Sequence, residues 1–238
     1  MLHAGNRSAL SVYDLNSFHL RRGLAIPPCG EYNQELAACP VNQFIYLSDW
    51  NKKSIHSLQA TDAASVFTWS VGANPFGIHV TTRQTVLVAC YHTHSLREYT
   101  SQGVHVREVK LVGVQNPWHA VQLPSGQLVV SRHDGALCRL NERGSKVEEV
   151  SQIPCNGAGL TLSADGCIII GAYGNSKVLV ANPDLSQVVE LPGDFRSPHN
   201  LCLETSRGQL FVGERSRGKS RIGVIDGVFK LLPYLNSK

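Results

Sequence analysis

Short apolar segments recur along the chain at a nearly constant spacing. Each consists of an apolar triplet followed by a small or polar residue, and the five copies lie at residues 45–49, 86–90, 128–132, 168–172 and 210–214. Their first residues are separated by 41, 42, 40 and 42 positions. Regularity of this kind over five copies indicates a structural repeat.

The residues around each triplet repeat as well, and they predict four strands per unit. In the second copy an apolar segment at 77–80 precedes a polar turn and the triplet, and strands at 95–99 and 104–109 follow. Four short strands in about 40–45 residues are the pattern of a β-propeller blade, and blades stack because one blade alone cannot bury both faces. Since the chain also lacks long helical periodicity, we predict an all-β fold.

We expect one domain over residues 1–238, a six-bladed β-propeller whose first blade is incomplete. The expected units are a partial blade at 1–28 and complete blades at 29–73, 74–115, 116–155, 156–196 and 197–238. In the partial blade we expect only the two outer strands, at 9–13 and 19–26. Because an unclosed ring leaves sheet edges unpaired, the pattern predicts a fragment of a longer propeller.

Composition agrees with this fold and excludes several classes of protein. The 238 residues include 21 Gly, 11 Pro and only 1 Met, which disfavours a helical bundle. The 22 Lys and Arg against 18 Asp and Glu give a net charge of +4, too small to indicate nucleic-acid binding by itself. No apolar run has the length of a signal peptide or a membrane span. We therefore expect a cytoplasmic protein without a membrane partner.

The cysteines predict a reducing compartment and no metal site. There are seven, an odd number, and none is spaced as C-x-x-C: Cys29, Cys39, Cys90, Cys138, Cys155, Cys167 and Cys202. Cys90, Cys138, Cys167 and Cys202 lie in apolar or alternating segments, so we expect them to be small core residues. No paired ligands at zinc-site spacing occur, and no cofactor is expected.

Residues 42–56, NQFIYLSDWNKKSIH, resemble an NHL repeat, and the segments 95–100 and 116–123 resemble other blades of NHL-type propellers. The resemblance covers nearly the whole chain and implies an NHL/TolB-like propeller that binds protein or RNA on one face. In tripartite-motif ubiquitin ligases such propellers follow RING, B-box and coiled-coil modules. None of these modules is present here, so the resemblance implies at most the substrate-recognition part of a larger protein.

Two other propeller families are similar in shorter segments. Residues 45–50 resemble a YWTD repeat, although the other blades lack this motif. Residues 155–157 and 162–166 resemble the gluconolactonase-like family, whose propeller holds a divalent cation with one Glu, two Asn and one Asp. That resemblance implies a metal-dependent lactonase with Asn156 and Asn200 as ligands, and it is the alternative to a binding protein. Its first-blade Glu is expected in the missing part of the propeller.

Some short motifs match chemical signatures but fit the repeat better. Residues 213–220 match the P-loop pattern G-x-x-x-x-G-K-S, yet the β-branched residues that follow predict a strand instead of the helix that a phosphate site needs. His92 and His94 are expected to be exposed loop residues, because no further metal ligands are identifiable near them. His119 and His199 flank the entries to inner strands and are expected to be structural histidines with satisfied hydrogen bonds; the alternative is a position at the mouth of the central channel. No catalytic residue is assigned.

The three tryptophans are expected mainly to pack between blades. Trp50, Trp69 and Trp118 all lie close to predicted strands. Of the three, Trp118 has the weakest case for a packing role, because it begins an inner strand.

The remaining candidate is one face of the propeller. The loops between second and third strands (b–c loops) and those between blades (d–a loops) emerge on the same side. The binding residues predicted on this face are Trp50, Lys52, Lys53, Tyr91, His92, His94, Trp118, Arg132, His133, Lys177, Arg196, His199, Arg215, Arg217, Lys219 and Arg221. Its acidic residues are Glu31, Glu35, Asp49, Asp134, Asp194 and Glu214.

Most of the positive charge excess maps to this face. It carries 9 basic and 6 acidic residues, a net charge of +3, against +1 for the rest of the chain. Basic loops beside aromatic residues suit acidic protein segments or an RNA backbone, while the alternative is a merely solvated loop face. We predict a non-enzymatic scaffold that binds a partner on this face. Because a net charge of +3 is modest, we expect the partner to be a protein, with RNA as the second choice and no indication of DNA.

Overall fold

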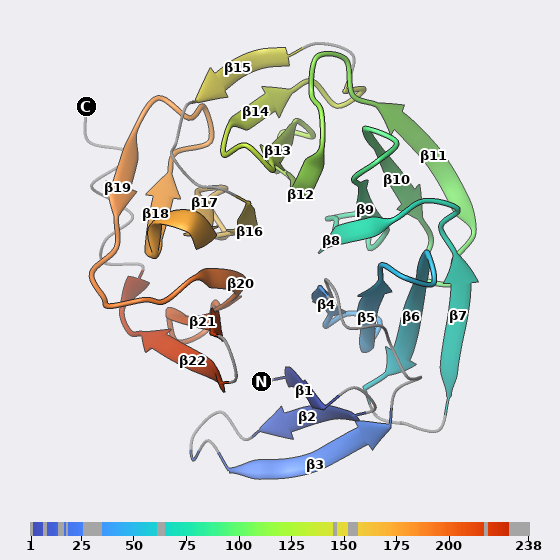
Figure 1. Ribbon diagram of the computed structural model, residues 1–238, viewed down its shortest axis with the longest axis vertical. Coiled ribbons are helices and arrows are strands. Elements are labelled where there is room, and N and C mark those ends of the chain that lie inside the picture. Colours follow the sequence, from blue (N-terminus) through green and yellow to red (C-terminus); the bar gives the residue numbers. More distant parts are fainter. Residues whose placement is uncertain are drawn as a thin grey trace.

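The computed structural model describes residues 2–6, 9–13, 17, 19–25, 35–60, 65–144, 147–151, 157–216 and 219–228. These residues form an all-β propeller, in which antiparallel sheets surround a central axis (Figure 1). In each sheet the strands follow one another in chain order, from the centre outwards. The all-β prediction is therefore confirmed.

Five sheets form the blades. Their strands are listed here by blade: β4 (Leu36–Cys39), β5 (Phe44–Asp49), β6 (Ser54–Gln59) and β7 (Val66–Ser70); β8 (Pro75–Val80), β9 (Val86–Cys90), β10 (Ser95–Tyr99) and β11 (His105–Lys110); β12 (Pro117–Gln122), β13 (Leu128–Arg132), β14 (Leu137–Leu140) and β15 (Val147–Ser151); β16 (Ala158–Leu162), β17 (Ile168–Ala172), β18 (Lys177–Ala181) and β19 (Val188–Glu190); β20 (Pro198–Glu204), β21 (Gln209–Ser216) and β22 (Lys219–Ile225). One short 3₁₀ helix, η1 (Tyr173–Asn175), joins β17 to β18. The fourth strand expected after residues 226–227 lies outside the described residues.

The first sheet differs from the expected partial blade. It has three strands, β1 (Leu2–Asn6), β2 (Ala9–Tyr13) and β3 (Leu20–Ala25), so one of the two inner strands that were expected to be absent is present. In Figure 1 this sheet lies between the last blade and the β4–β7 blade.

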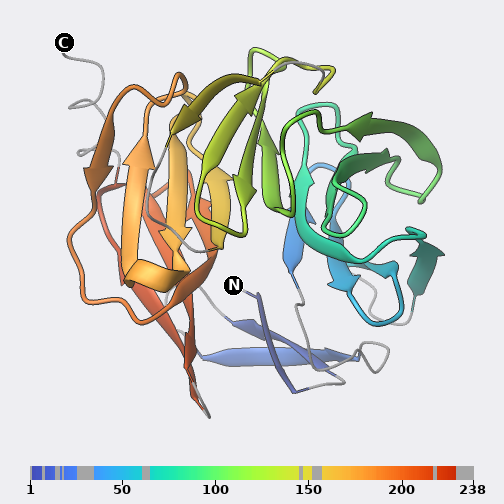
Figure 2. The same cartoon turned by 45° about the horizontal axis from the view of Figure 1, so that its top comes forward.

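The number of blades is five, and the prediction of six needs correction. The innermost strands β4, β8, β12, β16 and β20 pack against one another in chain order, whereas β1 makes no comparable contact among the described residues. In Figure 2, β2 and β3 also run across the direction of the strands of the β16–β19 blade. A sheet that contributes no strand to the inner ring does not extend the stack of blades.

The core lies between neighbouring blades, as a stack of two-faced sheets requires. Four separate clusters of buried apolar side chains fill the four interfaces from the β4–β7 blade to the β20–β22 blade. The triplets of the repeat supply much of this core, for example Val86, Val88, Ile168 and Ile170, all of which are fully buried. The continuous apolar character of the triplets reflects burial on both faces of the sheet.

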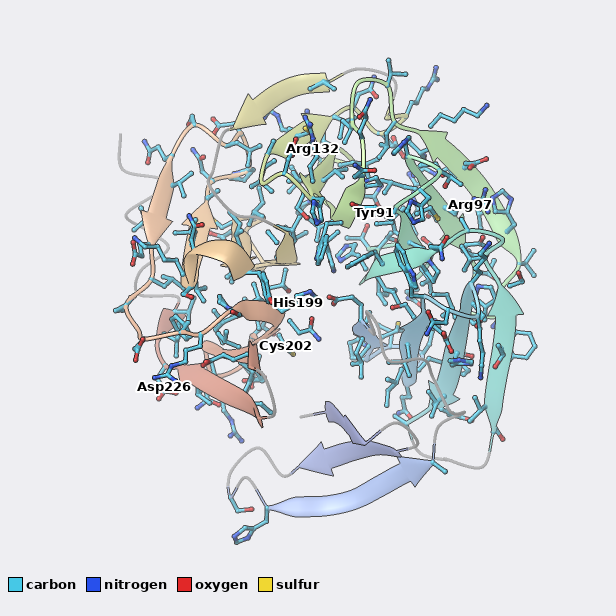
Figure 3. The ribbon with its side chains drawn as sticks, in the orientation of Figure 1. Tyr91, Arg97, Arg132, His199, Cys202 and Asp226 are labelled. Atoms are coloured by element: carbon cyan, nitrogen blue, oxygen red, sulfur yellow. The ribbon has the colours of Figure 1, made fainter. Side chains whose placement is uncertain are left out.

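The cysteine prediction holds for three of the four residues it named. Cys90, Cys138 and Cys167 are buried, whereas Cys202 is exposed and lies on the part of β20 nearest the middle of the ring (Figure 3). Its neighbours Leu201 and Leu203 pack against the apolar cluster between the last two blades, so alternation turns Cys202 to the opposite face of β20. Cys29 and Cys155 lie outside the described residues, and the five described cysteines are free thiols.

Among the residues that the structure describes, no helix has the length and apolarity to cross a bilayer.

Candidate functional site

Strand pairing places the b–c and d–a loops at the same end of the propeller. The first residue of an inner strand pairs with the end of the second strand of the same blade, as Pro75 does with Cys90, Pro117 with Arg132, and Ala158 with Ala172. The loop that enters each blade and the loop that leaves its second strand are therefore neighbours. We call this end the loop face.

Five structurally equivalent positions surround the axis just inside the loop face. Register with the second strand of each blade identifies them as Glu35, Gly77, His119, Gly159 and Asn200. Two of the five have no side chain, so the other three have room to extend towards one another. The large residues are anchored: the backbone N–H of Glu35 donates to Ser48 Oγ (2.9 Å), and that of His119 donates to the equivalent Ser131 Oγ (3.1 Å).

The two glycines allow close approach between blades. A Cβ at Gly159 would lie 1.7 Å from the carbonyl oxygen of His199, and a Cβ at Gly77 would lie 2.4 Å from the His119 ring. Since no larger residue fits either place without movement of the neighbouring strand, the glycines set the position of both histidines.

Three of the polar side chains meet at the axis. Glu35 Oε1 lies 2.8 Å from His199 Nδ1, and both side chains are at most 10% exposed. In the amide orientation that satisfies both groups, the Asn200 nitrogen donates to the two Glu35 oxygens at 2.9 and 3.0 Å. Asn200 itself is exposed, so solvent reaches this group. We call Glu35, His119, His199 and Asn200 the axial cluster.

His119 completes the cluster with an unsatisfied nitrogen. It is buried, its ring is hydrogen-bonded to the backbone of Ile78, and its Nδ1 has no hydrogen-bond partner among the described residues. Burial lowers the pKa of His119, against a smaller opposing effect of the Glu35 carboxylate. Burial also lowers the pKa of the neighbouring His79 to about 3. Both imidazoles are therefore neutral near pH 7, and His119 presents a buried hydrogen-bond acceptor.

Aromatic and imidazole rings form a continuous layer on the loop face. The Trp50 centroid lies 5.1 Å from that of Phe76 and 5.7 Å from that of Tyr91. His92 lies 5.3 Å from Trp50 and 5.0 Å from Tyr91. Tyr91 also contacts His133, at 5.8 Å, and so connects the second blade to the third.

The layer continues to the axial cluster. Trp118 lies 4.0 Å from Phe76, 5.3 Å from His133 and 5.8 Å from His199. Tyr173, in η1, lies 6.0 Å from His199 on its other side. His92, His133 and Tyr173 are exposed, whereas Phe76 is buried beneath them. We call Trp50, Phe76, Tyr91, His92, Trp118, His133 and Tyr173 the ring layer.

Of the predictions for Trp69 and His94, the first is confirmed and the second is wrong. Trp69 packs in the core of the β4–β7 and β8–β11 interface, as expected. His94 is not the exposed loop residue that the sequence predicts: it is half-buried, and its Nδ1 accepts a hydrogen bond from the backbone N–H of Asn116 at 3.0 Å. It therefore fixes one loop to the next blade.

Two of the basic residues of the loop face are engaged in ion pairs. Lys177 pairs with Glu190 at 2.6 Å, and Arg132 pairs with Asp134 beside it. Lys52, Lys53 and Arg196 are exposed. Arg217 and the side chains of Arg215, Lys219 and Arg221 lie outside the described residues.

The segment that matches a P-loop has a different backbone. Residues 213–216 end β21 and residues 219–220 begin β22, and the two strands pair as a hairpin from Gln209–Ser216 to Lys219–Ile225. A hairpin lacks the helix N-terminus that cradles phosphates in a P-loop. The prediction of a strand in this segment is confirmed.

A metal site is not evident in the described part of the chain. No three His, Cys, Asp or Glu side chains there are placed to share a metal ion. Of the two proposed lactonase ligands, Asn156 lies outside the described residues and Asn200 contacts the Glu35 carboxylate.

Sequence reasoning placed Glu35 in a loop and did not connect it with His199. The available signal was the register of the repeats: Gly77, His119 and Gly159 lie nine residues before the start of their triplets, and Glu35 and Asn200 lie ten residues before theirs. The contribution of Phe76 and Tyr173 to the ring layer has no comparable signal, because it depends on how each loop folds over its neighbour.

No family model matches the chain, and no curated protein sequence matches it. Similarity is found among solved structures. A chain of the nidogen/laminin complex superimposes with a TM-score of 0.76 at 17% identity, covering 94% of this chain and 88% of that one. A protein of unknown function from Bacteroides caccae gives a TM-score of 0.71 at 11% identity, covering 92% and 86%.

An enzyme has the same architecture. A catalytically inactive virginiamycin B lyase from Staphylococcus aureus, with quinupristin, gives a TM-score of 0.66 at 14% identity, covering 92% of this chain and 76% of that one. At these identities the similarity establishes the propeller fold alone, and one fold carries both binding and catalytic functions.

Proposed function

We propose that this propeller is a protein-binding module that receives its partner on the loop face. The observation that carries the proposal is the ring layer, an uninterrupted set of aromatic and imidazole contacts from the β5–β6 loop to η1. Tyr and Trp supply large, rigid contact area and are enriched where binding energy concentrates in protein interfaces.

The frame beneath the ring layer favours this use. Phe76 is buried beneath the rings, and the blade interfaces on either side of it are filled by packed apolar side chains. Rings held on such a frame lose little conformational freedom on binding, which lowers the cost of association. The similar chain in the nidogen/laminin complex supports a protein partner as a use of this architecture.

A protein partner fits the described charges better than RNA does. Lys177 and Arg132 are engaged with Glu190 and Asp134. Lys52, Lys53 and Arg196 remain exposed on the loop face. RNA binding requires several cations that are available to phosphates, and a surface with three such cations and seven aromatic or imidazole rings is closer to a protein interface.

The lactonase alternative receives less support. The Glu35 carboxylate does approach Asn200, but it also contacts His199 at 2.8 Å, and this arrangement offers a hydrogen-bonded cluster in place of an open oxygen cage. We therefore retain the non-enzymatic function.

A cytoplasmic location remains a prediction from the cysteine pattern.

The test is a selection of peptides from a random displayed library on the purified chain. The peptides selected are then titrated against single variants with exposed rings truncated, His133→Ala and Tyr173→Ala. We expect each variant to weaken binding by about tenfold or more, the effect of losing one important interface contact.

A control variant lies at the opposite end of the propeller. Val104 is 63% exposed and follows the turn between the third and fourth strands, so Val104→Ser should leave binding unchanged. If the selected peptides lose affinity in Val104→Ser and keep it in the ring variants, the loop face is not the binding surface. Binding to a labelled RNA that falls steeply with salt would favour the alternative partner.

A further inference from the structure

The axial cluster contains a carboxylate that the fold itself does not require. Glu35 is 4% exposed, and the equivalent position in two other blades is glycine. A buried carboxylate is costly unless hydrogen bonds and an opposite charge compensate for lost hydration. The contacts with Asn200 and His199 compensate part of that cost. Because two other blades have glycine at this position, the repeat itself does not need a carboxylate there, and Glu35 indicates a function at the axis.

The cluster holds more acceptors than donors. The Glu35 oxygens receive the Asn200 amide and face His199 Nδ1, while His119 Nδ1 is buried without a partner. His119 is neutral, so it adds a lone pair and no positive charge. An acceptor left unsatisfied in a protein interior is destabilising, and a bound donor would remove that penalty.

Aromatic rings border the same group. Trp118 and Tyr173 lie on two sides of His199, at 5.8 and 6.0 Å between centroids, with interplanar angles of 65° and 88°. His199 in turn contacts the Glu35 carboxylate at 2.8 Å, so the charge and the two rings lie in one neighbourhood. A carboxylate and aromatic rings both stabilise a cation, the rings through their quadrupoles. Asn200, which donates to the carboxylate, is itself exposed.

We propose that the axial cluster binds the cationic side chain, guanidinium or ammonium, of a partner segment that lies on the ring layer. This inference rests on the proposed function for the source of the cation. Glu35 is the charged acceptor, His119 Nδ1 accepts a second hydrogen bond, and Trp118 and Tyr173 flank the bound group. A guanidinium fits this set well, because its donors form a planar fork that bonds a carboxylate and a second acceptor together.

The first experiment uses small probes and does not require a peptide. Calorimetric titration compares Nα-acetyl-arginine amide with Nα-acetyl-citrulline amide, which has nearly the same shape and no charge. We expect the arginine probe to bind about 10- to 100-fold more tightly, the range for a hydrogen bond to a charged group. Equal binding of the two probes, or preferential binding of Nα-acetyl-glutamate amide, would overturn the proposal.

Two substitutions locate the site. Glu35→Gln keeps the shape and should abolish the preference for arginine over citrulline, whereas the matched control Glu190→Gln, at an exposed position of an outer strand, should preserve it. Asn200→Ala changes an exposed side chain and removes the amide that donates to the Glu35 carboxylate. The Asn200→Ala variant should therefore bind the arginine probe at least as tightly as the unmodified chain. A preference that survives Glu35→Gln, or a tenfold weakening in Asn200→Ala, would contradict the assignment.

The peptide selection separates this inference from the proposed function. If the selected peptides require the exposed rings but neither contain Arg or Lys nor respond to Glu35→Gln, the loop face binds protein and the axial cluster plays no part. If the arginine probe binds through Glu35 while no peptide depends on the ring layer, the cation site stands and the protein partner does not.

Discussion

Gly159 provides the sharpest test of how the axial cluster is built. In Gly159→Ala the new Cβ would start 1.7 Å from the carbonyl oxygen of His199, where an ordinary contact is at least 3.4 Å. The obstacle is backbone in the next blade, so rotation of a side chain cannot relieve it. Either β16 or β20 must move by more than an ångström.

The expected cost follows from this geometry. Overpacking a dense interior costs typically about 1–3 kcal/mol, and a clash with backbone belongs at the upper end. Alanine regains about 0.5–1 kcal/mol in a strand relative to glycine. We therefore expect Gly159→Ala to lower the free energy of unfolding by about 2–3 kcal/mol.

Gly213→Ala is the matched control. It also lies in a blade strand near the axis, but its nearest contact would be 3.3 Å, to Asn200 Cβ, so we expect a change within about 0.5 kcal/mol. Equilibrium urea unfolding followed by circular dichroism measures both, through a shift of the midpoint at unchanged slope. If Gly159→Ala and Gly213→Ala agree within about 1 kcal/mol, the close approach of β16 and β20 is not a determinant of the fold.

Three further predictions concern other parts of the molecule. Glu98 is 3% exposed and accepts from Arg107 Nε at 2.5 Å, so Glu98→Gln should cost about 2 kcal/mol in the same unfolding assay, and no loss would show that the pair is dispensable. Burial lowers the pKa of His79 to about 3 from 6.5, so the unfolded chain binds the proton more readily, and the free energy of unfolding should fall as the pH drops from 6.5 towards 3. The contribution of His79 is at most about 1.4 kcal/mol per pH unit, and an equally steep pH dependence in His79→Gln would contradict it. Because residues 213–216 and 219–220 belong to two paired strands, ATP with Mg²⁺ should not raise the thermal midpoint, whereas a saturable rise would restore the P-loop interpretation.

The sequence was sufficient to predict the blades because each repeat contains its own strands and turns. The triplets occupy the second strands β9, β13 and β17 with no shift in residues. The same local regularity identified the loop face, since connectivity alone decides which loops share an end. The strands of a blade and the end at which its loops emerge are both determined within a single repeat. Because the repeat occurs five times, each copy supports the interpretation of the others.

Contacts between different blades could not be predicted from the sequence. The approach of Glu35 to His199 joins the first and last of the five blades, and it depends on how the inner strands are arranged around the axis. The ring layer likewise depends on loops that lie over adjacent blades, as Tyr91 does towards His133. The first sheet was mispredicted for a related reason: β2 and β3 were recognised locally, but membership of the stack requires an inner strand that packs against its neighbours.

The axial cluster arises where the repeat is least regular. A ring of five identical large residues would collide at the axis, and a ring of five glycines would leave it empty. Alternation of small and large residues fills a tapering interior, and here Gly77 and Gly159 separate the positions of Glu35, His119 and Asn200. The glycines give the polar groups space, and Ser48 and Ser131 hold the backbone of Glu35 and His119 in place. Selection for stability alone would favour apolar residues at these three positions, because burying a carboxylate and an imidazole weakens the fold. These polar residues are the basis of the proposed cation site, and the irregular positions of a repeat are where such a site should be sought.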